Sequence, residues 1–367
     1  MPVTRRAFLQ TAGALAAGGL LGAPALSFAA PPKPPRTLRE KVGQLFVVSF
    51  AGTTPAPSLL SWIERYHFGG VILFTRNYTS PGQLKVLLSH LQGVSSYPLL
   101  VCTDQEGGLV VRLRNGVHTF PSEATYGQVG SASRVYNDAT TTARDLHPLG
   151  LTMNLAPVVD VLTNPQSPIG TRSYGPNPQL DARLSVAAIK GYQQHRLAAT
   201  AKHFIGLGHT SVNSHQALPV VSRTLAQLQS VDLIPFRAAI AAGVSTILVA
   251  HVALPAIDPV HRPASLSPVI IGNLIRKQLG FNGVVMTDSL IMGAINIGTS
   301  SAAQQAFAAG ADILLIAKNT NIPEATFDDA YNRVLWAVQT RRIPESHLDS
   351  AVNRILALKR AYPATVL

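Results

Sequence analysis

The strongest constraint on the fold of this chain is a regular alternation of short apolar segments with longer amphipathic ones. Apolar runs of strand length occur at residues 45–50, 70–74, 99–104, 152–161, 200–204, 246–252, 283–288 and 311–317. Helical patterns separate them, for example at residues 58–67, 83–91, 180–196, 225–242 and 269–279. A repeated strand–helix unit predicts a parallel sheet that helices cover on both faces.

Eight such units predict an α/β fold, a single (β/α)8 barrel of the TIM type. The pattern alone leaves an open, doubly wound sheet as the alternative. A final helical pattern has Leu348, Val352, Ile355 and Leu356 on one face, and we expect no second α/β domain after it. We therefore expect one catalytic barrel domain over residues 31–367.

Residues 1–30 are predicted to be a twin-arginine signal peptide rather than part of the fold. The segment Thr4–Leu9 contains Arg5 and Arg6, an apolar run follows to Leu26, and small residues at 27–29 offer a cleavage site. Glycines and a proline interrupt the apolar run, which makes it a weak membrane-spanning helix. We expect export to the periplasm, cell wall or medium without an integral span after cleavage; a retained N-terminal anchor is the alternative.

Charge and cysteine content narrow the expected partners. Without the signal peptide, the chain contains 28 Lys and Arg residues and 18 Asp and Glu residues, which gives a net charge of +10. A basic surface favours anionic neighbours such as cell-wall polymers, although it can equally serve solubility. The basic residues are scattered and form no nucleic-acid-binding motif, so we expect no nucleic acid partner. We also expect the protein to be a monomer. The single cysteine, Cys102, lies in an apolar run and is expected to be buried and unpaired.

Polar residues gather where the predicted strands end. They are Asp104, Arg172, Lys202, His203, His251 and Asp288. In a barrel, the carboxyl ends of all strands face one rim, so these side chains are expected to form one binding site.

One loop, residues 201–219, concentrates chemistry-bearing side chains: AKHFIGLGHTSVNSHQALP. It resembles the signature loop of family 3 glycoside hydrolases in their β-N-acetylglucosaminidase branch, K-H-F-P-G-H-G-D-T followed by D-S-H-x-x-L-P. Residues 283–292, GVVMTDSLIM, resemble the family motif G-V-V-x-[TS]-D-[SD]-L-x-M. Further matching segments extend the resemblance over residues 38–362.

The resemblance implies a retaining glycosidase that removes terminal β-linked N-acetylhexosamine, with cell-wall glycans as the expected substrate class. Asp288 matches the family's nucleophile, and His215 matches the histidine that acts as acid and base. An imidazole suits the second role because it titrates near neutrality. The resemblance implies no cofactor.

The same comparison implies the residues that hold the sugar. DQEGGLVVR at 104–112 and IGTRSYG at 169–175 resemble family motifs. The residues implied to bind substrate are Asp104, Arg112, Arg172, Lys202 and His203, and His251 is implied to support the site. We interpret Glu106 as support for the turn at Gly107 and Gly108.

Four positions of the loop depart from the family pattern: Ile205, Leu207, His209 and Asn213. The family has Asp at the position of Asn213, where its charge supports the catalytic imidazole. An amide can hydrogen-bond the ring but cannot stabilise an imidazolium by charge. Reduced activity, an acid-shifted optimum or a different substrate are the expected consequences.

Three alternatives remain open at the level of sequence. One is a sugar-binding pseudoenzyme, which Asn213 favours and the intact Asp288 and His215 oppose. Another is a β-glucosidase or a glycoside phosphorylase on the same scaffold, since an uncharged dyad would tolerate phosphate. The last is a metal site built from His203, His209 and His215, whose spacing suits neither a helix nor a strand.

Overall fold

The computed structural model describes residues 34–365, so the predicted signal peptide lies outside the described residues. Eight parallel strands form its central sheet, in the spatial order β10, β1, β2, β3, β6, β7, β8, β9. They are β1 (Phe46–Ser49), β2 (Gly70–Leu73), β3 (Leu100–Thr103), β6 (Met153–Asn154), β7 (Ala198–Phe204), β8 (Thr246–Val249), β9 (Val284–Thr287) and β10 (Leu314–Ile316). A parallel bridge between Met286 and Ile313 joins the two ends of this order. The sheet is therefore a closed barrel, and the open-sheet alternative is wrong.

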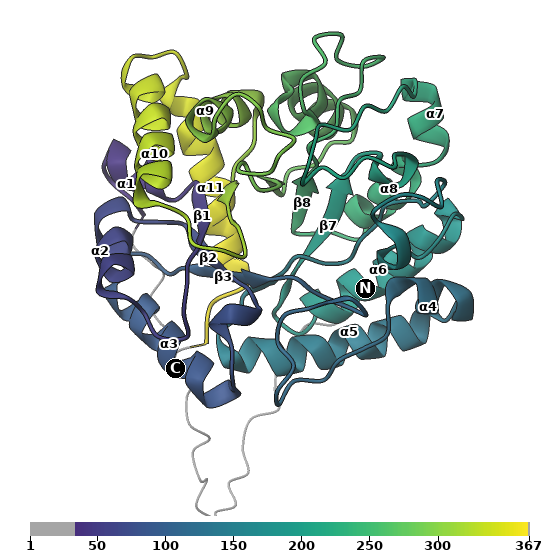
Figure 1. Ribbon diagram of the computed structural model, residues 1–367, viewed down its shortest axis with the longest axis horizontal. Helices are drawn as coiled ribbons and strands as arrows, with labels where there is room; N and C mark the ends of the chain where they lie inside the picture. The colour runs from purple at the N-terminus through teal and green to yellow at the C-terminus, as the bar shows by residue number, and fades with distance from the viewer. Residues whose placement is uncertain (1–33, 366–367) are drawn as a thin grey trace, which may run out of the picture. The chain divides into compact units, whose positions relative to one another are not determined.

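Helices surround the barrel, as Figure 1 shows. They are α1 (Leu38–Gly43), α2 (Pro57–Tyr66), α3 (Pro81–Val94), α4 (Glu123–Val129), α5 (Ala132–Leu146), α6 (Pro178–Gln193), α7 (Leu225–Ser230), α8 (Leu233–Ala241), the π-helix η6 (Val269–Gln278), α9 (Thr299–Ala309), α10 (Glu324–Gln339) and α11 (Glu345–Ala361). Short 3₁₀ turns are η1 (Thr75–Asn77), η2 (His147–Leu149), η3 (Gly170–Arg172), η4 (Leu207–His209) and η5 (Ala264–Leu266). Among these described helices, none combines the length and apolarity that crossing a bilayer requires.

Local sequence explains where several helices begin. The Thr37 hydroxyl accepts the backbone N–H of Glu40, whose carboxylate accepts the N–H of Thr37, so α1 has a complete capping box. The Asn177 side chain accepts the backbone N–H groups of Gln179 and Leu180 and so caps α6, whose first residue is Pro178. These caps satisfy the free N–H groups at the first turn of each helix.

Two predicted elements are shorter than the sequence pattern indicated. The predicted helix over residues 225–242 is broken into α7 and α8 between Ser230 and Leu233. Pro235 is tolerated in the first turn of α8 but would disrupt a continuous helix. The predicted strand over residues 152–161 is a continuous strand only at Met153 and Asn154, and an isolated parallel bridge between Val158 and Lys202 follows. Pro157, between the two, has no N–H to donate to the ladder.

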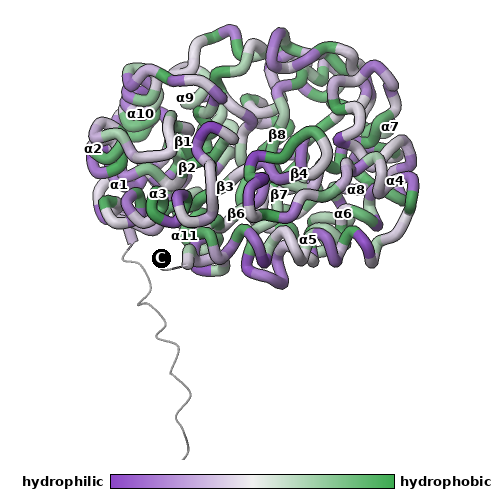
Figure 2. Tube along the Cα trace, turned by 60° about the horizontal axis from the view of Figure 1, so that its bottom comes forward, coloured by the Kyte–Doolittle hydropathy of each residue, from purple (hydrophilic) through white to green (hydrophobic). Residues whose placement is uncertain are grey.

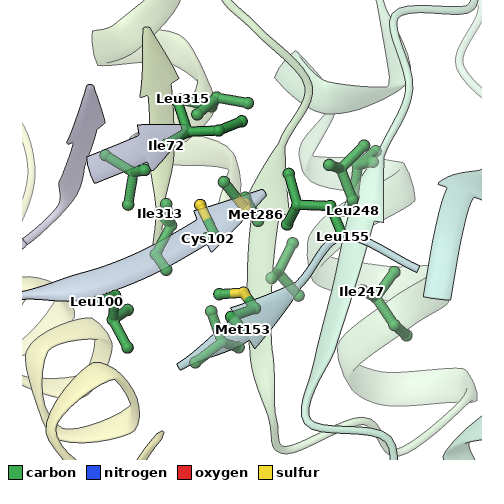
Figure 3. Packing of buried hydrophobic residues seen from close by; sticks show 14 of the residues in the cluster. Ile72, Leu100, Cys102, Met153, Leu155, Ile247, Leu248, Met286, Ile313 and Leu315 are labelled. Atoms are coloured by element: carbon green, nitrogen blue, oxygen red, sulfur yellow. The ribbon is translucent and has the colours of Figure 1, made fainter. Parts of the chain in front are cut away.

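Apolar side chains fill the barrel interior (Figure 3). Cys102 lies there beside Met286 and Ile313 and has no exposed surface, which confirms the expectation of a buried thiol. Burial raises the pKa of the Cys102 thiol, so it stays protonated. The interior layer nearest the carboxyl ends of the strands also forms the floor of the pocket described below; it contains Ile72, Leu155, Leu248 and Leu315.

A buried amine in α11 makes the stability of the fold depend on pH. The Lys359 side chain is 4% exposed and donates from Nζ to Oε1 of Gln44 over 2.6 Å. Burial lowers the pKa of Lys359 from 10.5 to about 7. Between these two values the unfolded chain binds the proton and the folded chain does not, so stability rises with pH in this interval.

We expect Lys359→Met to be more stable than the wild type near pH 7 and to lose that advantage at higher pH. The difference in unfolding free energy should fall by up to about 1.4 kcal/mol per pH unit as pH rises from 7 towards 10. Urea unfolding of both proteins across this interval measures the difference. Parallel stability curves for the two proteins would contradict the assignment of a neutral, buried amine.

Candidate active site

The carboxyl ends of the strands surround a pocket of about 700 Å³. Of the nine residues that the sequence nominated, eight line it: Asp104, Arg112, Arg172, Lys202, His203, Asn213, His215 and Asp288. The ninth, His251, is fully buried and does not line the pocket. In Figure 2, hydrophilic stretches lie around β4 (Gln105–Gly107), which pairs with β5 (Val110–Val111) in a hairpin after β3.

Lys202 and Glu106 form the buried centre of an ion-pair network on one wall. The Nζ atom of Lys202, in β7, lies 2.7 Å from Oδ1 of Asp104 and 2.6 Å from Oε1 of Glu106. Arg172 donates to both Glu106 oxygens, over 2.7 Å from Nε and 2.8 Å from Nη2. Arg112 approaches Oδ2 of Asp104 at 3.5 Å and stacks over the ring of Phe74.

The network fixes the charge of its members. Burial alone would raise the pKa of Glu106, but Lys202 and Arg172 hold it well below its ordinary value. Burial would likewise lower the pKa of Lys202, but Asp104 and Glu106 raise it. These side chains stay ionised at neutral pH and form a rigid polar wall of the kind that binds sugar hydroxyls.

The interpretation of Glu106 as a turn support is therefore wrong. Its carboxylate, 2% exposed, accepts from Lys202 and Arg172 instead. Its partners lie 66 and 96 residues away along the chain, and only the closed barrel brings them together. The turn itself relies on positive backbone φ angles at Gly107 and Gly108.

His203 has a fixed orientation and a fixed tautomer. Its Nδ1 lies 2.7 Å from Oδ2 of Asp160, and its Nε2 lies 3.3 Å from Nη2 of Arg172. A guanidinium only donates hydrogen bonds, so Nε2 accepts and Nδ1 carries the proton toward the carboxylate. Sequence reasoning missed this role of Asp160, which no local signal connects to His203.

Asp288 follows β9 and is positioned by backbone groups. Its N–H donates to the carbonyl of Val249, and its Oδ1 accepts the N–H of Ser289 over 2.7 Å. Burial would raise the pKa of Asp288, but the nearby His251 and His203, the Ser289 N–H and His215 lower it below its usual value. Asp288 is therefore an ordered, ionised carboxylate in the pocket.

The loop that carries His215 packs against the loop that carries Asp288. Backbone N–H groups of Gly293 and Ala294 donate to the carbonyls of His215 and Ser214. A Cβ at position 293 would lie 2.6 Å from the carbonyl oxygen of His215, so this contact requires glycine. The imidazole of His215 is exposed to the pocket, and within the described residues it accepts and donates no hydrogen bond.

Asn213 does not hold the ring of His215. Its Oδ1 accepts the backbone N–H of His215 over 2.9 Å, and its own carbonyl accepts from Gln216 and Ala217. The amide therefore caps a turn. This corrects the expectation that the amide could hydrogen-bond the imidazole.

His209, another departure from the family pattern, anchors the same loop. Its Nε2 lies 2.7 Å from Oδ1 of Asp232, at the junction of α7 and α8, and its Nδ1 bonds to the hydroxyl of Thr163. The metal alternative would need the imidazoles of His203, His209 and His215 to converge. His203 instead bonds to Asp160, His209 bonds to Asp232, and His215 is exposed to the pocket. In the part of the chain that the structure describes, no three metal-ligating side chains converge.

Comparisons with known proteins identify the family of this chain. The family profile described as glycosyl hydrolase family 3 N terminal domain matches residues 37–358. The chain belongs to glycoside hydrolase family 3. This confirms the family that the sequence motifs indicated.

Relatives within family 3 carry specific names. A Beta-hexosaminidase of Nitrosomonas eutropha is 35% identical over 307 residues, 81% of this chain and 86% of that protein. The structure of a family 3 beta-N-acetylglucosaminidase from Paenibacillus sp. superposes with a TM-score of 0.87 at 41% identity, covering 89% of this chain and 63% of that one. A Beta-N-acetylhexosaminidase from Beutenbergia cavernae superposes with a TM-score of 0.82 at 29% identity, covering 89% and 100%. The chain thus spans less than two thirds of the Paenibacillus protein and all of the Beutenbergia one.

Proposed function

We propose that this family 3 member is a retaining glycosidase that removes terminal β-linked N-acetylglucosamine. The observation that carries the proposal is the ionised Asp288, held by Ser289 in a pocket that the network of Asp104, Glu106, Arg172 and Lys202 also lines. The names of relatives that align over most of the chain support the choice of N-acetylhexosamine.

The proposed reaction has two displacements at the anomeric carbon. A carboxylate oxygen of Asp288 attacks that carbon while its bond to the leaving oxygen breaks, and protonated His215 gives its proton to that oxygen. Water then attacks the same carbon, His215 takes the proton of the water, and the bond to Asp288 breaks. Two inversions give net retention, and the reaction consumes no cofactor.

The sugar is held by the polar wall. Asp104 accepts hydrogen bonds from the sugar hydroxyl groups, while the hydrogen bond that it accepts from Lys202 keeps its carboxylate in place. Arg112, Arg172 and His203 line the same pocket, and the hydrogen bond to Asp160 fixes the tautomer of His203. Export by the twin-arginine route, cell-wall glycans as substrate and a monomeric state belong to the proposal and rest on the sequence patterns alone.

Release of 4-nitrophenol from its N-acetyl-β-glucosaminide between pH 4 and 8 tests the proposal, with proton NMR to identify the first anomer formed. We expect turnover with a β-anomeric product. Preference for the β-glucoside would shift the assignment to a β-glucosidase, and a phosphate-dependent sugar phosphate product would indicate a phosphorylase. No turnover of either substrate, with or without phosphate, would favour the sugar-binding pseudoenzyme.

The position of Asn213 makes a separate prediction. In Asn213→Asp, one carboxylate oxygen can still accept the His215 N–H while the added charge stabilises the imidazolium. We expect kcat to rise several-fold, on the order of 3- to 10-fold, and the basic limb of kcat/KM to move to higher pH. Asn213→Ser keeps a turn-capping oxygen without the charge and serves as the control. Identical pH profiles for the three proteins would contradict a charge effect.

A further inference from the structure

His251 is a fully buried imidazole behind the loop that carries Asp288. Its Nε2 lies 2.8 Å from the carbonyl oxygen of Ser289, and its Nδ1 lies 2.6 Å from Oγ of Ser265. A carbonyl oxygen only accepts hydrogen bonds, so Nε2 carries the proton. Nδ1 of the neutral ring must then accept the hydroxyl proton of Ser265, which is itself fully buried in η5.

Ser289 connects His251 to the carboxylate of Asp288. Its carbonyl accepts from His251 on one side, and its N–H donates to Oδ1 of Asp288 on the other. Its hydroxyl donates to the carbonyl of Ala317 over 2.6 Å and accepts the N–H of Ala317 over 3.0 Å. Every polar group of Ser289 is thus engaged, and both peptide groups that flank it are held in place.

We propose that Ser265, His251 and Ser289 form a hydrogen-bonded chain that positions Asp288 for attack on the anomeric carbon. The chain runs from the Ser265 hydroxyl to Nδ1 of His251, from Nε2 to the Ser289 carbonyl, and from the Ser289 N–H to Oδ1. With Oδ1 held in this way, Oδ2 is the oxygen presented to the substrate. Ser265 and His251 are positioning residues, because neither lines the pocket.

The inference rests on the proposed function and adds Ser265, which lies in a segment that resembles the family but to which the sequence assigned no role. It also gives His251 a defined role in place of general support. Ser265 is set by its own backbone, since its N–H donates to the carbonyl of Ala250 beside His251. The Ser265 hydroxyl selects the His251 tautomer, and that tautomer donates to the Ser289 carbonyl, which also accepts the N–H of Met292.

The kinetic test uses Ser265→Ala, His251→Phe and His251→Gln with 4-nitrophenyl N-acetyl-β-glucosaminide. We expect kcat to fall about 10-fold in Ser265→Ala and about 100-fold in His251→Phe, since a slightly misplaced nucleophile loses rate at this scale. KM should change by less than about twofold, because the sugar-binding wall is untouched. The amide of His251→Gln can still donate to the Ser289 carbonyl, so this variant should recover part of the rate.

Ser267→Ala is the matched control. Ser267 is equally buried, lies two residues from Ser265, and its hydroxyl donates to Asp258 without touching the chain to Asp288. We expect a comparable loss of thermal stability with kcat unchanged. Equal kcat values for Ser265→Ala and Ser267→Ala in an active enzyme, or no recovery in His251→Gln relative to His251→Phe, would overturn the positioning role.

Nitrogen NMR of histidine-labelled protein tests the chain without reference to activity. The titratable groups facing His251 are Asp288 and His215. We expect a neutral ring protonated at Nε2 between about pH 6 and pH 8, and a mixed tautomer signal in Ser265→Ala. A ring protonated at Nδ1, or no response to Ser265→Ala, would overturn the inference. Absence of glycosidase activity together with the expected NMR result would refute only the proposed function.

Discussion

Asp288→Asn is expected to reduce kcat with 4-nitrophenyl N-acetyl-β-glucosaminide by at least about 10³-fold, because the amide cannot form the covalent ester. The amide oxygen can still accept the Ser289 N–H that holds Oδ1 in the wild type. The fold and the sugar-binding wall should therefore persist, and binding of N-acetylglucosamine should remain measurable by calorimetry. Loss of turnover with retained binding would identify a missing nucleophile rather than a damaged pocket.

The leaving group provides the control for this prediction. A nucleophile is needed with every aglycone, whereas a proton donor matters most when the leaving oxygen is strongly basic. Asp288→Asn should thus be inactive on aryl and sugar aglycones alike, while His215→Ala should retain more activity on the aryl substrate than on a disaccharide. Activity of Asp288→Asn near the wild-type level on either substrate would refute the assignment of the nucleophile.

Glu106→Gln is expected to lower the free energy of unfolding by about 3–5 kcal/mol, the usual loss when one partner of a buried ion pair is removed. Lys202 is 2% exposed and would keep only Asp104 as a charged partner, while Arg172 would lose its two bonds to a carboxylate. Since these residues also face the pocket, KM should rise together with the loss of stability. Urea unfolding and initial rates measure the two effects.

Asp312→Asn is a matched control for Glu106→Gln. Asp312 is a fully buried carboxylate that pairs with Arg276 and Arg354, and it precedes β10 at the end of the barrel away from the pocket. This variant should lose comparable stability while KM stays at the wild-type value. A similar rise in KM for both variants would show that the Glu106 effect reflects general loosening of the barrel.

The fold could be predicted from sequence because the strands are buried on both faces. Runs such as residues 71–74 and 247–250 are apolar throughout, which is characteristic of parallel strands beneath helices. The sequence could not decide whether the sheet closes, since closure requires the first strand to pair with the last, here β1 with β10 through Phe46 and Leu314. Sequence periodicity carries no information on such a distant pairing.

Most residues of the site could be predicted from the sequence, but their hydrogen-bond and ion-pair partners could not. Position at strand ends and family resemblance identified Asp104, Lys202 and Asp288, and all three line one pocket. The partners of Glu106 and of His203 depend on side chains far apart in the chain, which only the folded barrel determines. The side-chain oxygen of Asn213 likewise accepts the backbone N–H of His215 rather than a hydrogen bond from its imidazole ring. The sequence does not indicate which of these two donors is used.

The anchor between His209 and Asp232 has a consequence for engineering this enzyme. The family pattern has Asp at the position of His209, so transplanting a relative's loop alone would set a new carboxylate against Asp232, which is 4% exposed. Two buried carboxylates at that distance repel each other and cannot both ionise without cost. A chimeric design must therefore carry the junction of α7 and α8 along with the loop. In this chain the loop that contains His209 and the junction that contains Asp232 have to be exchanged together.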